Sequence, residues 1–511
     1  MERSAGILLP VFSLPGPYGI GSLGREARAF AEFLHNAGQR WWQVLPVGPT
    51  GAGNSPYTSE STFAGNPLLI DLEDLRDQGL LTEAELSAAR VPEGAPIDYA
   101  ALYESREALL RRAFSRLGGA EAQSVRDFAA ANPWLGEYAL YRALKARFGQ
   151  TAWFDWPDKD LLNHDPAALA AARQELAEDI AFHQAVQFWF FSQWKALKDH
   201  ANGLGVRIIG DLPIYVSLDS ADVWSERREF LLDKAGRPSR VAGVPPDYFS
   251  EEGQLWGNPL YDWAAQKRDG FGWWIRRVEG ASRLFDAIRI DHFRAFDTYW
   301  KIPASSPTAR EGEWIEAPGY AVLDVLLKDN PDVKIVAEDL GDMRPQVYEL
   351  RDAYHLPGMK IIQFTFDPME HNNLFEDREN MIVYTGTHDN EPIKGWFQGQ
   401  PRKVRLATEG ELYAWGYEED SVAKNFICYT LDNKADIAIL PVQDVLELDN
   451  AGRMNTPGTL GTPNWEWRLA SLDKLKDKKA FIRKALAKSG RVEGGKMPVR
   501  KRRRPDCKED K

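Results

Sequence analysis

The chain has 511 residues, a formal net charge of −12, a sequence pI near 5.4 and 18 Trp among 12% aromatic residues. Such an acidic chain is a poor match for nucleic acid or an anionic membrane, because both ligands require a positive field. Two cysteines cannot build a disulfide framework, no run of about 18 apolar residues occurs, and the first residues lack a signal-peptide pattern, so we expect a soluble, cytoplasmic protein with a neutral ligand.

Short apolar segments closed by polar residues recur along the chain. They are 6–12, 41–48, 206–213, 285–291, 333–340, 359–366, 381–389 and 435–442. Most of them follow a helical pattern that a glycine or proline ends, and this alternation is typical of a parallel sheet. The pattern predicts an α/β fold, a (β/α)8 TIM barrel whose active face is formed by the carboxyl ends of its strands.

The first segment is followed by GIGSLG (19–24), which has the glycine spacing of a dinucleotide site. Such a site also needs an acidic residue about 20 positions further on, at the end of the next strand. The next predicted strand, WWQVLPVG, offers only Gln43 as a polar side chain. We therefore expect these glycines to shape a turn, and we expect no cofactor.

Two long insertions interrupt the repeat. After the second strand, Ala, Leu, Glu and Arg at helical spacing predict a helical insertion over about 73–170. After the third strand, an insertion over about 217–280 contains GVPPDYFSEEGQLWGNPLY (243–261), which we expect to form a long ordered loop over the active face. The catalytic barrel is expected to fill 1–490 without a separate C-terminal β domain, and 491–511 to be a basic, disordered tail.

Three of the predicted strands end in carboxylates that have no evident structural need: Asp291, Glu338 and Asp389. In a barrel all three face the same rim. Glycoside cleavage uses two carboxyl groups across the scissile bond, and a third can stabilise positive charge on the sugar ring. Any one of them alone would be interpreted as a helix cap or a salt-bridge partner. Three on one rim, two of them beside histidines, indicate catalysis.

The neighbours of these carboxylates suggest their roles. Arg289 lies two residues before Asp291 and therefore on the same face of the strand, where it can keep a nucleophile ionised. Glu338 follows apolar residues, so burial should raise its pKa, as a general acid requires. His388 precedes Asp389 and can donate a hydrogen bond to a sugar hydroxyl. The histidines and acids lack the spacing of a zinc site, so we expect no metal.

Four motifs occur in order along the chain: GDLPIYV (210–216), RIDHFR (289–294), AEDLG (337–341) and TGTHDNEP (385–392). Their order and spacing resemble the motif set of the 4-α-glucanotransferases called amylomaltases, glycoside hydrolase family 77 of the α-amylase superfamily. The resemblance continues through RWWQVLPVGPTGAGNSPYTSESTFAGNPLLIDL near the start, the 243–261 segment and RMNTPGTLGTPNWEWRL (453–469). It covers nearly the whole chain except the tail.

The resemblance implies that Asp291 is the nucleophile, Glu338 the acid/base and Asp389 the transition-state stabiliser. It also implies a set of substrate-binding residues: Arg289, His388, Asp211, Ser55 and Tyr57 around the cleaved glucose, His292 beside the nucleophile, and Gln254, Trp256 and Asn464 along the acceptor side of the cleft. The implied reaction moves α-1,4-glucan segments to the 4-hydroxyl of an acceptor glucan or glucose with retention of configuration.

Two alternatives stay open at this stage. An α-1,4-glucan hydrolase of the same superfamily would share the three carboxylates but pass the sugar to water. A glucan-binding or scaffold protein would keep the cleft without the chemistry, although an intact set of carboxylates favours an enzyme. We expect the partners to be maltooligosaccharides, starch or glycogen chains and glucose, and the protein to be a monomer or a weak homo-oligomer.

Overall fold

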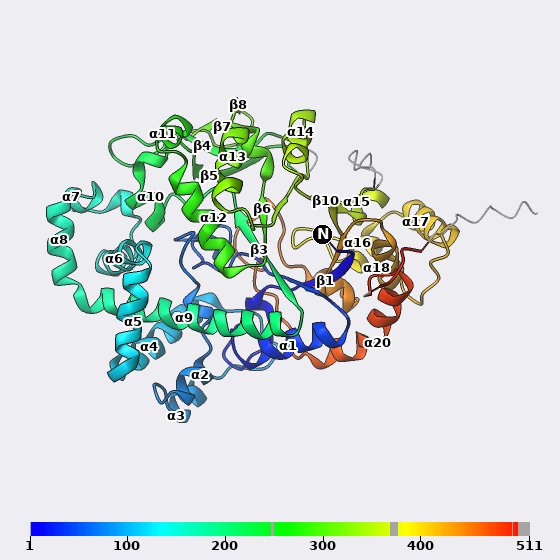
Figure 1. Ribbon diagram of the computed structural model, residues 1–511, viewed down its shortest axis with the longest axis horizontal. Coiled ribbons are helices and arrows are strands. Elements are labelled where there is room, and N and C mark those ends of the chain that lie inside the picture. Colours follow the sequence, from blue (N-terminus) through cyan, green and yellow to red (C-terminus); the bar gives the residue numbers. More distant parts are fainter. Residues whose placement is uncertain (1, 247–249, 368–376, 493, 499–511) are drawn as a thin grey trace, which may run out of the picture.

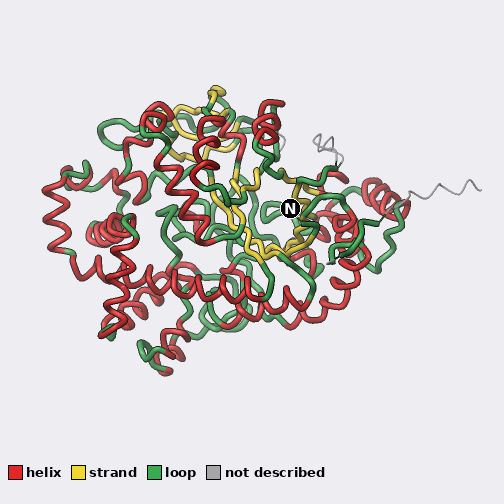
Figure 2. Tube along the Cα trace, in the orientation of Figure 1, coloured by secondary structure: helices red, strands yellow, loops and turns green. Residues whose placement is uncertain are grey.

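The computed structural model describes residues 2–246, 250–367, 377–492 and 494–498. Eight parallel strands lie at its centre, drawn in yellow in Figure 2: β1 (Ser4–Leu8), β2 (Trp41–Gln43), β3 (Arg207–Pro213), β6 (Ala287–Asp291), β9 (Ile335–Ala337), β10 (Gly358–Ile361), β11 (Met381–Tyr384) and β12 (Ile437–Pro441). They are hydrogen-bonded in the order β10-β11-β12-β1-β2-β3-β6-β9. Each predicted strand overlaps one of them, which confirms the predicted α/β barrel.

The edge strands β9 and β10 nearly close this sheet. The N–H of Ala337 in β9 donates to the carbonyl of Pro357, just before β10, at 2.9 Å. Closure removes the unpaired edges of a sheet, and the interior is then filled by side chains. The buried apolar residues that fill it include Leu8, Trp41, Ile209, Ala287, Val336, Met359, Ile361, Ile382, Tyr384, Ile437 and Ile439.

The sixth predicted strand continues as a helix. The segment 359–366 reads as one apolar run, but its second half forms the helix α15 (Ile362–Phe366). The N–H of Gln363 donates to the carbonyl of Thr385, after β11, at 3.0 Å. The chain therefore turns into a helix at the carboxyl end of β10, where a barrel strand reaches the active face.

Helices surround the barrel (Figure 1). Those before β3 are α1 (Arg25–Asn36), α2 (Leu72–Asp77), α3 (Glu83–Ala88), α4 (Tyr99–Ser115), α5 (Gly119–Ala131), α6 (Trp134–Arg147), α7 (Lys159–Leu162), α8 (Pro166–Glu175) and α9 (Ala177–Gly203). Those after β3 are α10 (Ala221–Ser225), α11 (Trp263–Arg268), α12 (Gly272–Leu284), α13 (Gly319–Asp329), α14 (Pro345–Ala353), α16 (Ile393–Gly399), α17 (Arg402–Ala414), α18 (Val422–Asp432), α19 (Val442–Val445) and α20 (Asp473–Lys488).

The long helix α9 joins the helical region after β2 to the barrel. Its buried residues recur every three or four positions, as in Phe182, Val186, Trp189, Gln193 and Leu197, and so form one face. The helix packs against α1, α5 and α6. Helices α2 to α9 thus occupy the chain between β2 and β3, and the boundaries of an insertion over about 73–170 stay a prediction.

A second, antiparallel sheet lies beside the carboxyl end of β6 (Figure 1, top). It contains β4 (Arg240–Val244), β5 (Gln254–Pro259), β7 (Thr298–Pro303) and β8 (Glu313–Glu316), in the order β5-β4-β7-β8. The 243–261 segment, expected as a loop, therefore contributes strand residues, while 247–249 lie outside the described residues. Gly243 permits this pairing, since an added Cβ would lie 2.2 Å from the carbonyl oxygen of Gln254.

The glycines of 19–24 shape a turn, as expected. Gly19 has a positive φ of 83°, which favours glycine. A Cβ at Gly24 would lie 1.9 Å from the carboxylate of Asp71, so this position has no room for a side chain. No helix among the described residues is both long and apolar enough to cross a membrane.

Ordered structure continues into the predicted tail. Arg491 is 1% exposed. It donates hydrogen bonds to the carbonyl oxygens of Ser4, Leu431, Asn433, Ala435 and Asp436. These bonds join the chain after α20 to the starts of β1 and β12. Residues 499–511, the remainder of the predicted tail, lie outside the described residues.

Candidate active site

Asp291 ends β6 and is paired with Arg289 two residues before it. Arg289 Nη2 donates to Asp291 Oδ1 at 2.8 Å, and Nη1 donates to the Oδ1 and Oδ2 of Asp211 at 2.7 and 2.6 Å. The register of β3 and β6 places Asp211 opposite Arg289. Although burial alone would lower it, Asp211 and Asp291 raise the pKa of Arg289 well above its ordinary value. The Asp291 side chain stays 29% exposed and can therefore reach a ligand.

Glu338 follows β9 and is buried beside this pair. Its Oε2 accepts the backbone N–H of His292 at 2.7 Å, and its Oε1 accepts that of Leu340 at 3.1 Å. Burial raises the pKa of Glu338 to about 8, against the opposing effect of Arg289. The raised pKa inferred from the apolar residues before Glu338 is thus confirmed in direction and cause, and the carboxyl group holds a proton at neutral pH.

The bond to Glu338 depends on the backbone of His292. This residue has φ 54° and ψ 50°, a left-handed conformation that non-glycine residues rarely adopt. Such outliers concentrate at functional sites, where surrounding structure holds them in place. Burial lowers the pKa of the His292 ring to about 4, so the ring is neutral at pH 7.

His388 and Asp389 lie on the segment that follows β11. The Nε2 of His388 is 3.4 Å from Asp389 Oδ2. Asp389 Oδ1 accepts a hydrogen bond from Asn455 Nδ2 at 2.6 Å, and its backbone oxygen accepts one from Arg453 Nη2 at 3.0 Å. The motif that contains Arg453 and Asn455 was part of the resemblance, but neither residue was singled out, because nothing local in the sequence links them to Asp389.

Ser55 and Tyr57 approach the same rim from the chain after β2. Tyr57 Oη donates to Asp211 Oδ2 at 2.6 Å, and Ser55 Oγ accepts the N–H of Tyr57 at 3.2 Å. The Tyr57 ring stacks on His388 with a centroid distance of 5.3 Å. The ring centroid of Trp465 lies 5.8 Å from those of Tyr57 and His388. Trp465 was not identified as a site residue from the sequence. Tyr57 therefore connects Asp211 with the segment after β11.

Gln254 and Trp256 are neighbours on β5. Trp256 Nε1 donates to Gln254 Oε1 at 3.1 Å. The Trp256 ring meets the His292 ring edge to face, at a centroid distance of 4.9 Å and an angle of 89°. Trp256 is nevertheless 36% exposed, an unusual state for so large an apolar ring. The second sheet thus presents an exposed indole next to His292, the residue that follows β6.

Asn464 is buried and faces its own segment. Its Oδ1 accepts the N–H of Thr456 at 2.9 Å, and its Nδ2 donates to Thr459 Oγ1 at 2.8 Å. These bonds hold Asn464 against residues 456–459. The residue after it, Trp465, packs against Tyr57 and His388. Asn464 therefore contacts the site through Trp465, whereas the other expected residues lie on the rim itself or on β5.

The rim combines two carboxyl groups in different environments. Asp291 is paired with a guanidinium, and Glu338 is buried with its pKa raised to about 8. Glycoside cleavage needs this combination, with one carboxylate and one protonated carboxyl group. Within the described ranges, no cluster of three or more His, Cys, Asp and Glu could hold a metal ion.

Comparisons with known proteins agree with this geometry. A family model described as 4-alpha-glucanotransferase matches residues 9–474. The 4-alpha-glucanotransferase of Thermus thermophilus is 47% identical over 483 residues, which cover 92% of this chain and 95% of the relative. The 4-alpha-glucanotransferase of Aquifex aeolicus is 43% identical over 495 residues, which cover 96% of this chain and 99% of the relative.

Solved structures give the same result. An amylomaltase from Streptococcus agalactiae, in complex with acarbose, matches with a TM-score of 0.92 and 36% identity, covering 96% of this chain and 100% of that chain. An amylomaltase from Corynebacterium glutamicum, 18% identical, matches with a TM-score of 0.77 over 94% of this chain and 75% of that chain, and so shares the fold.

Proposed function

Because the chain belongs to the 4-α-glucanotransferase family, glycoside hydrolase family 77, we propose that its three rim carboxylates transfer α-1,4-glucan segments by a retaining double displacement. The chain is a glycosyltransferase that acts on α-1,4-glucans. The observation that carries the mechanism is the combination of a guanidinium-paired Asp291 with a buried Glu338 whose pKa is raised to about 8.

In the first step, Asp291 attacks the anomeric carbon of the donor glucan. Glu338 gives its proton to the departing glycosidic oxygen, so the C–O bond breaks as the bond to Asp291 forms. The product is a covalent glycosyl-enzyme. Asp389, across the rim, stabilises the positive charge that develops on the sugar ring. Hydrogen bonds from Asn455 to its Oδ1 and from Arg453 to its backbone oxygen support this role, because they hold Asp389 in place.

In the second step, Glu338 acts as a base. It takes the proton of the acceptor 4-hydroxyl, whose oxygen displaces Asp291 and restores the original configuration. A retaining mechanism requires the two carboxyl groups to be about 5 to 5.5 Å apart, which leaves no room for a water molecule between them. Water and acceptor then compete only for the glycosyl-enzyme.

We propose that donors and acceptors are maltooligosaccharides, starch or glycogen chains and glucose. Tyr57, His388 and Trp465 form a continuous group of rings beside Asp211, and aromatic faces cover the apolar faces of sugar rings well. We also propose that the protein is cytoplasmic and monomeric or weakly oligomeric; two cysteines in 511 residues cannot build a disulfide framework, which agrees with a reducing compartment.

Incubation with maltotriose tests the function. A transferase releases glucose and a ladder of longer glucans while the number of reducing ends stays constant. An α-glucan hydrolase would instead raise the reducing ends in step with glucose, and this result would contradict the proposal. Glu338→Gln should abolish both products, which separates an enzyme from a glucan-binding scaffold.

A further inference from the structure

Asp444 is a buried carboxylate that the proposed mechanism does not use. It lies in α19, directly after the last barrel strand β12, and is 2% exposed. Its hydrogen-bond partners among the described residues are a hydroxyl and a backbone N–H, with no cation. A carboxylate buried without a cation costs several kcal/mol unless it is well hydrogen-bonded.

The two donors lie at opposite ends of one segment. Thr385 Oγ1 contacts Asp444 Oδ2 at 2.5 Å, and the N–H of Ile393 donates to Asp444 Oδ1 at 2.7 Å. Thr385 is the first residue after β11, and Ile393 is the first residue of α16. One carboxylate therefore binds both ends of the segment 385–393, which carries His388 and Asp389.

The interior of this segment is held by bonds within it and by a bond from α15. The N–H and Oγ1 of Thr387 donate to Asn390 Oδ1 at 2.8 and 2.9 Å, and Gln363 Nε2 donates to the carbonyl of Glu391 at 2.9 Å. The segment is therefore attached to α15 through Gln363 and, at both of its ends, to α19 through Asp444. A turn with these internal bonds and fixed ends moves as one unit.

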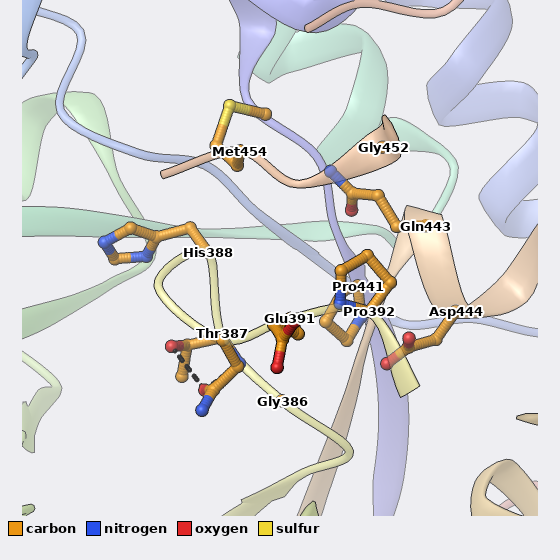
Figure 3. A pocket seen from close by; sticks show the side chains of 11 residues that line it. Gly386, Thr387, His388, Glu391, Pro392, Pro441, Gln443, Asp444, Gly452 and Met454 are labelled. Carbon is orange, nitrogen blue, oxygen red and sulfur yellow. Dashed lines mark hydrogen bonds between the residues drawn. The ribbon is translucent and has the colours of Figure 1, made fainter. Parts of the chain in front are cut away.

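Figure 3 shows this arrangement around a small cavity, with Thr387 and His388 on one side and Asp444 on the other. The cavity has a volume of about 10 Å³, about what one water molecule needs. Burial raises the pKa of Asp444 to about 6, while Thr385 and Ile393 oppose this shift. The bonds to the segment thus favour the ionised form despite the burial.

We propose that Asp444 is a positioning residue for the segment that carries His388 and Asp389. By binding both ends of 385–393, it fixes the position of Asp389 at the rim. This inference rests on the proposed role of Asp389 as the transition-state stabiliser. A misplacement of about 1 Å at a reacting group can cost on the order of 100-fold in rate. Loss of Asp444 should therefore lower kcat much more than it raises KM.

Three variants test this role in the full chain. Asp444→Ala removes both bonds. Asp444→Asn keeps an oxygen for the N–H of Ile393 and an amide for Thr385, so it should rescue most of the loss. Thr385→Val removes only the hydroxyl at nearly constant shape. We expect Asp444→Ala to lower kcat for maltotriose transfer by about 10- to 100-fold, with Thr385→Val between it and the parent.

Asp71→Ala is the matched control. Asp71 is also buried and binds a hydroxyl, that of Ser22 at 2.6 Å, and a backbone N–H, that of Asp74 at 2.9 Å, at the start of α2. Its loss should lower the unfolding temperature and leave kcat unchanged. A purely structural Asp444 would behave in the same way, so a parent-like kcat in folded Asp444→Ala and Thr385→Val would overturn the inference.

A double-mutant cycle identifies Asp389 as the group affected. With α-maltosyl fluoride as an activated donor, the cost of Asp444→Ala should shrink severalfold in an Asp389→Asn background. An undiminished cost would overturn the inference. If Asp444→Ala fails to fold, Thr385→Val and Asp444→Asn are run through the same cycle. Failure of the proposed function is recognised separately, because the parent itself would then form no glucan ladder from maltotriose.

Discussion

Glu338 and Asp291 are chemically similar groups that their surroundings make different. The Asp291 carboxylate meets the guanidinium of Arg289 at 2.8 Å, whereas Glu338 is buried and bound by two backbone N–H groups. Burial dominates at Glu338 because the opposing effect of Arg289 is smaller. The roles proposed for them, acid and nucleophile, therefore follow from their positions in the barrel.

This difference predicts the pH dependence of the first step. Glu338 must be protonated to act as an acid, and burial raises its pKa to about 8, so kcat/KM for maltotriose should fall as the pH rises through about 8. α-Maltosyl fluoride needs no protonation of its leaving group and should lack this alkaline decrease. A decrease shared by both donors would show that another group, or loss of the fold, is responsible.

The hydrogen bond from Asn455 to Asp389 leads to a second prediction, which concerns kcat. Its bond to Asp389 Oδ1 is 2.6 Å long, and a hydrogen bond to a charged group contributes about 1.5 to 3 kcal/mol. Asn455→Ala should therefore lower kcat by about 10- to 100-fold, and Asn455→Asp further, because it places a like charge beside Asp389. Steady-state transfer kinetics measure this. Equal rates for Asn455→Asp and the parent would contradict the assignment.

Local spacing made some site residues predictable and left others hidden. Arg289 and Asp291 are two positions apart in a strand, so the sequence alone indicated that their side chains meet. Asn455 and Asp389 are separated by 66 positions, and their contact depends on how the segment after α19 folds back over the rim. Trp465 stayed hidden for the same reason, since an isolated tryptophan in a sequence is usually interpreted as a core residue.

At the scale of elements, β5 holds an indole at the edge of the site. Leu255 and Trp256 are adjacent on this strand and therefore point to opposite faces, with exposures of 39% and 36%. Trp256 meets the His292 ring, whose backbone binds Glu338. In the proposed mechanism, β5 would therefore lie beside the glycosyl-enzyme, where Trp256 could contact an acceptor.

We predict that Trp256→Ala raises hydrolysis relative to transfer. A transferase must exclude water and keep the acceptor close to the glycosyl-enzyme, and the indole provides apolar surface at that position. The ratio of new reducing ends to glucan ladder from maltotriose measures the effect. Trp256→Phe should restore much of the transfer, and Leu255→Ala is the matched control on the other face. An unchanged ratio in Trp256→Ala would contradict this role.

The short strands of the second sheet were less predictable than those of the barrel. Barrel strands are buried on both faces and read as continuous apolar runs, as in VRIIGDLP before the rim. In β4 and β5, glycine, proline and exposed aromatic residues interrupt the pattern, and pairing depends on partners far away in the chain. The sequence therefore indicated the position of these residues over the rim but not their secondary structure.

At the scale of the whole molecule, both ends of the described chain meet at one barrel seam. β1 pairs with β12, and Arg491 donates to the carbonyl of Ser4 at 2.7 Å and to that of Leu431 at 2.6 Å. The positively charged side chain is almost fully buried among carbonyl oxygens. The sequence of the basic segment 491–511 predicts a solvated tail. The carbonyl groups that bind Arg491, its first residue, come together only in the folded barrel.

Arg491→Ala should therefore destabilise the fold. Its loss removes five donated hydrogen bonds, although Arg3 still donates to the carbonyls of Leu431, Asn433 and Ala435, so we expect the free energy of unfolding to fall by about 1 to 3 kcal/mol. Urea denaturation measures the change. Arg483→Ala is the control, because exposed Arg483 donates to a single carbonyl, that of Asn36, and its loss should have little effect. Equal stability of the two variants would show that the bonds at the seam contribute little.

The second sheet has a consequence for exchanging parts between relatives. Its four strands come from two stretches of the chain, 240–259 and 298–316, and β6 with Asp291 lies between them. The strand that carries Asp291 thus lies, in sequence, between the two halves of this sheet. A chimaera that swaps only the stretch before β6 would split the pairing of β4 with β7. The second sheet can therefore be exchanged only as two separate stretches, or as one stretch that includes β6.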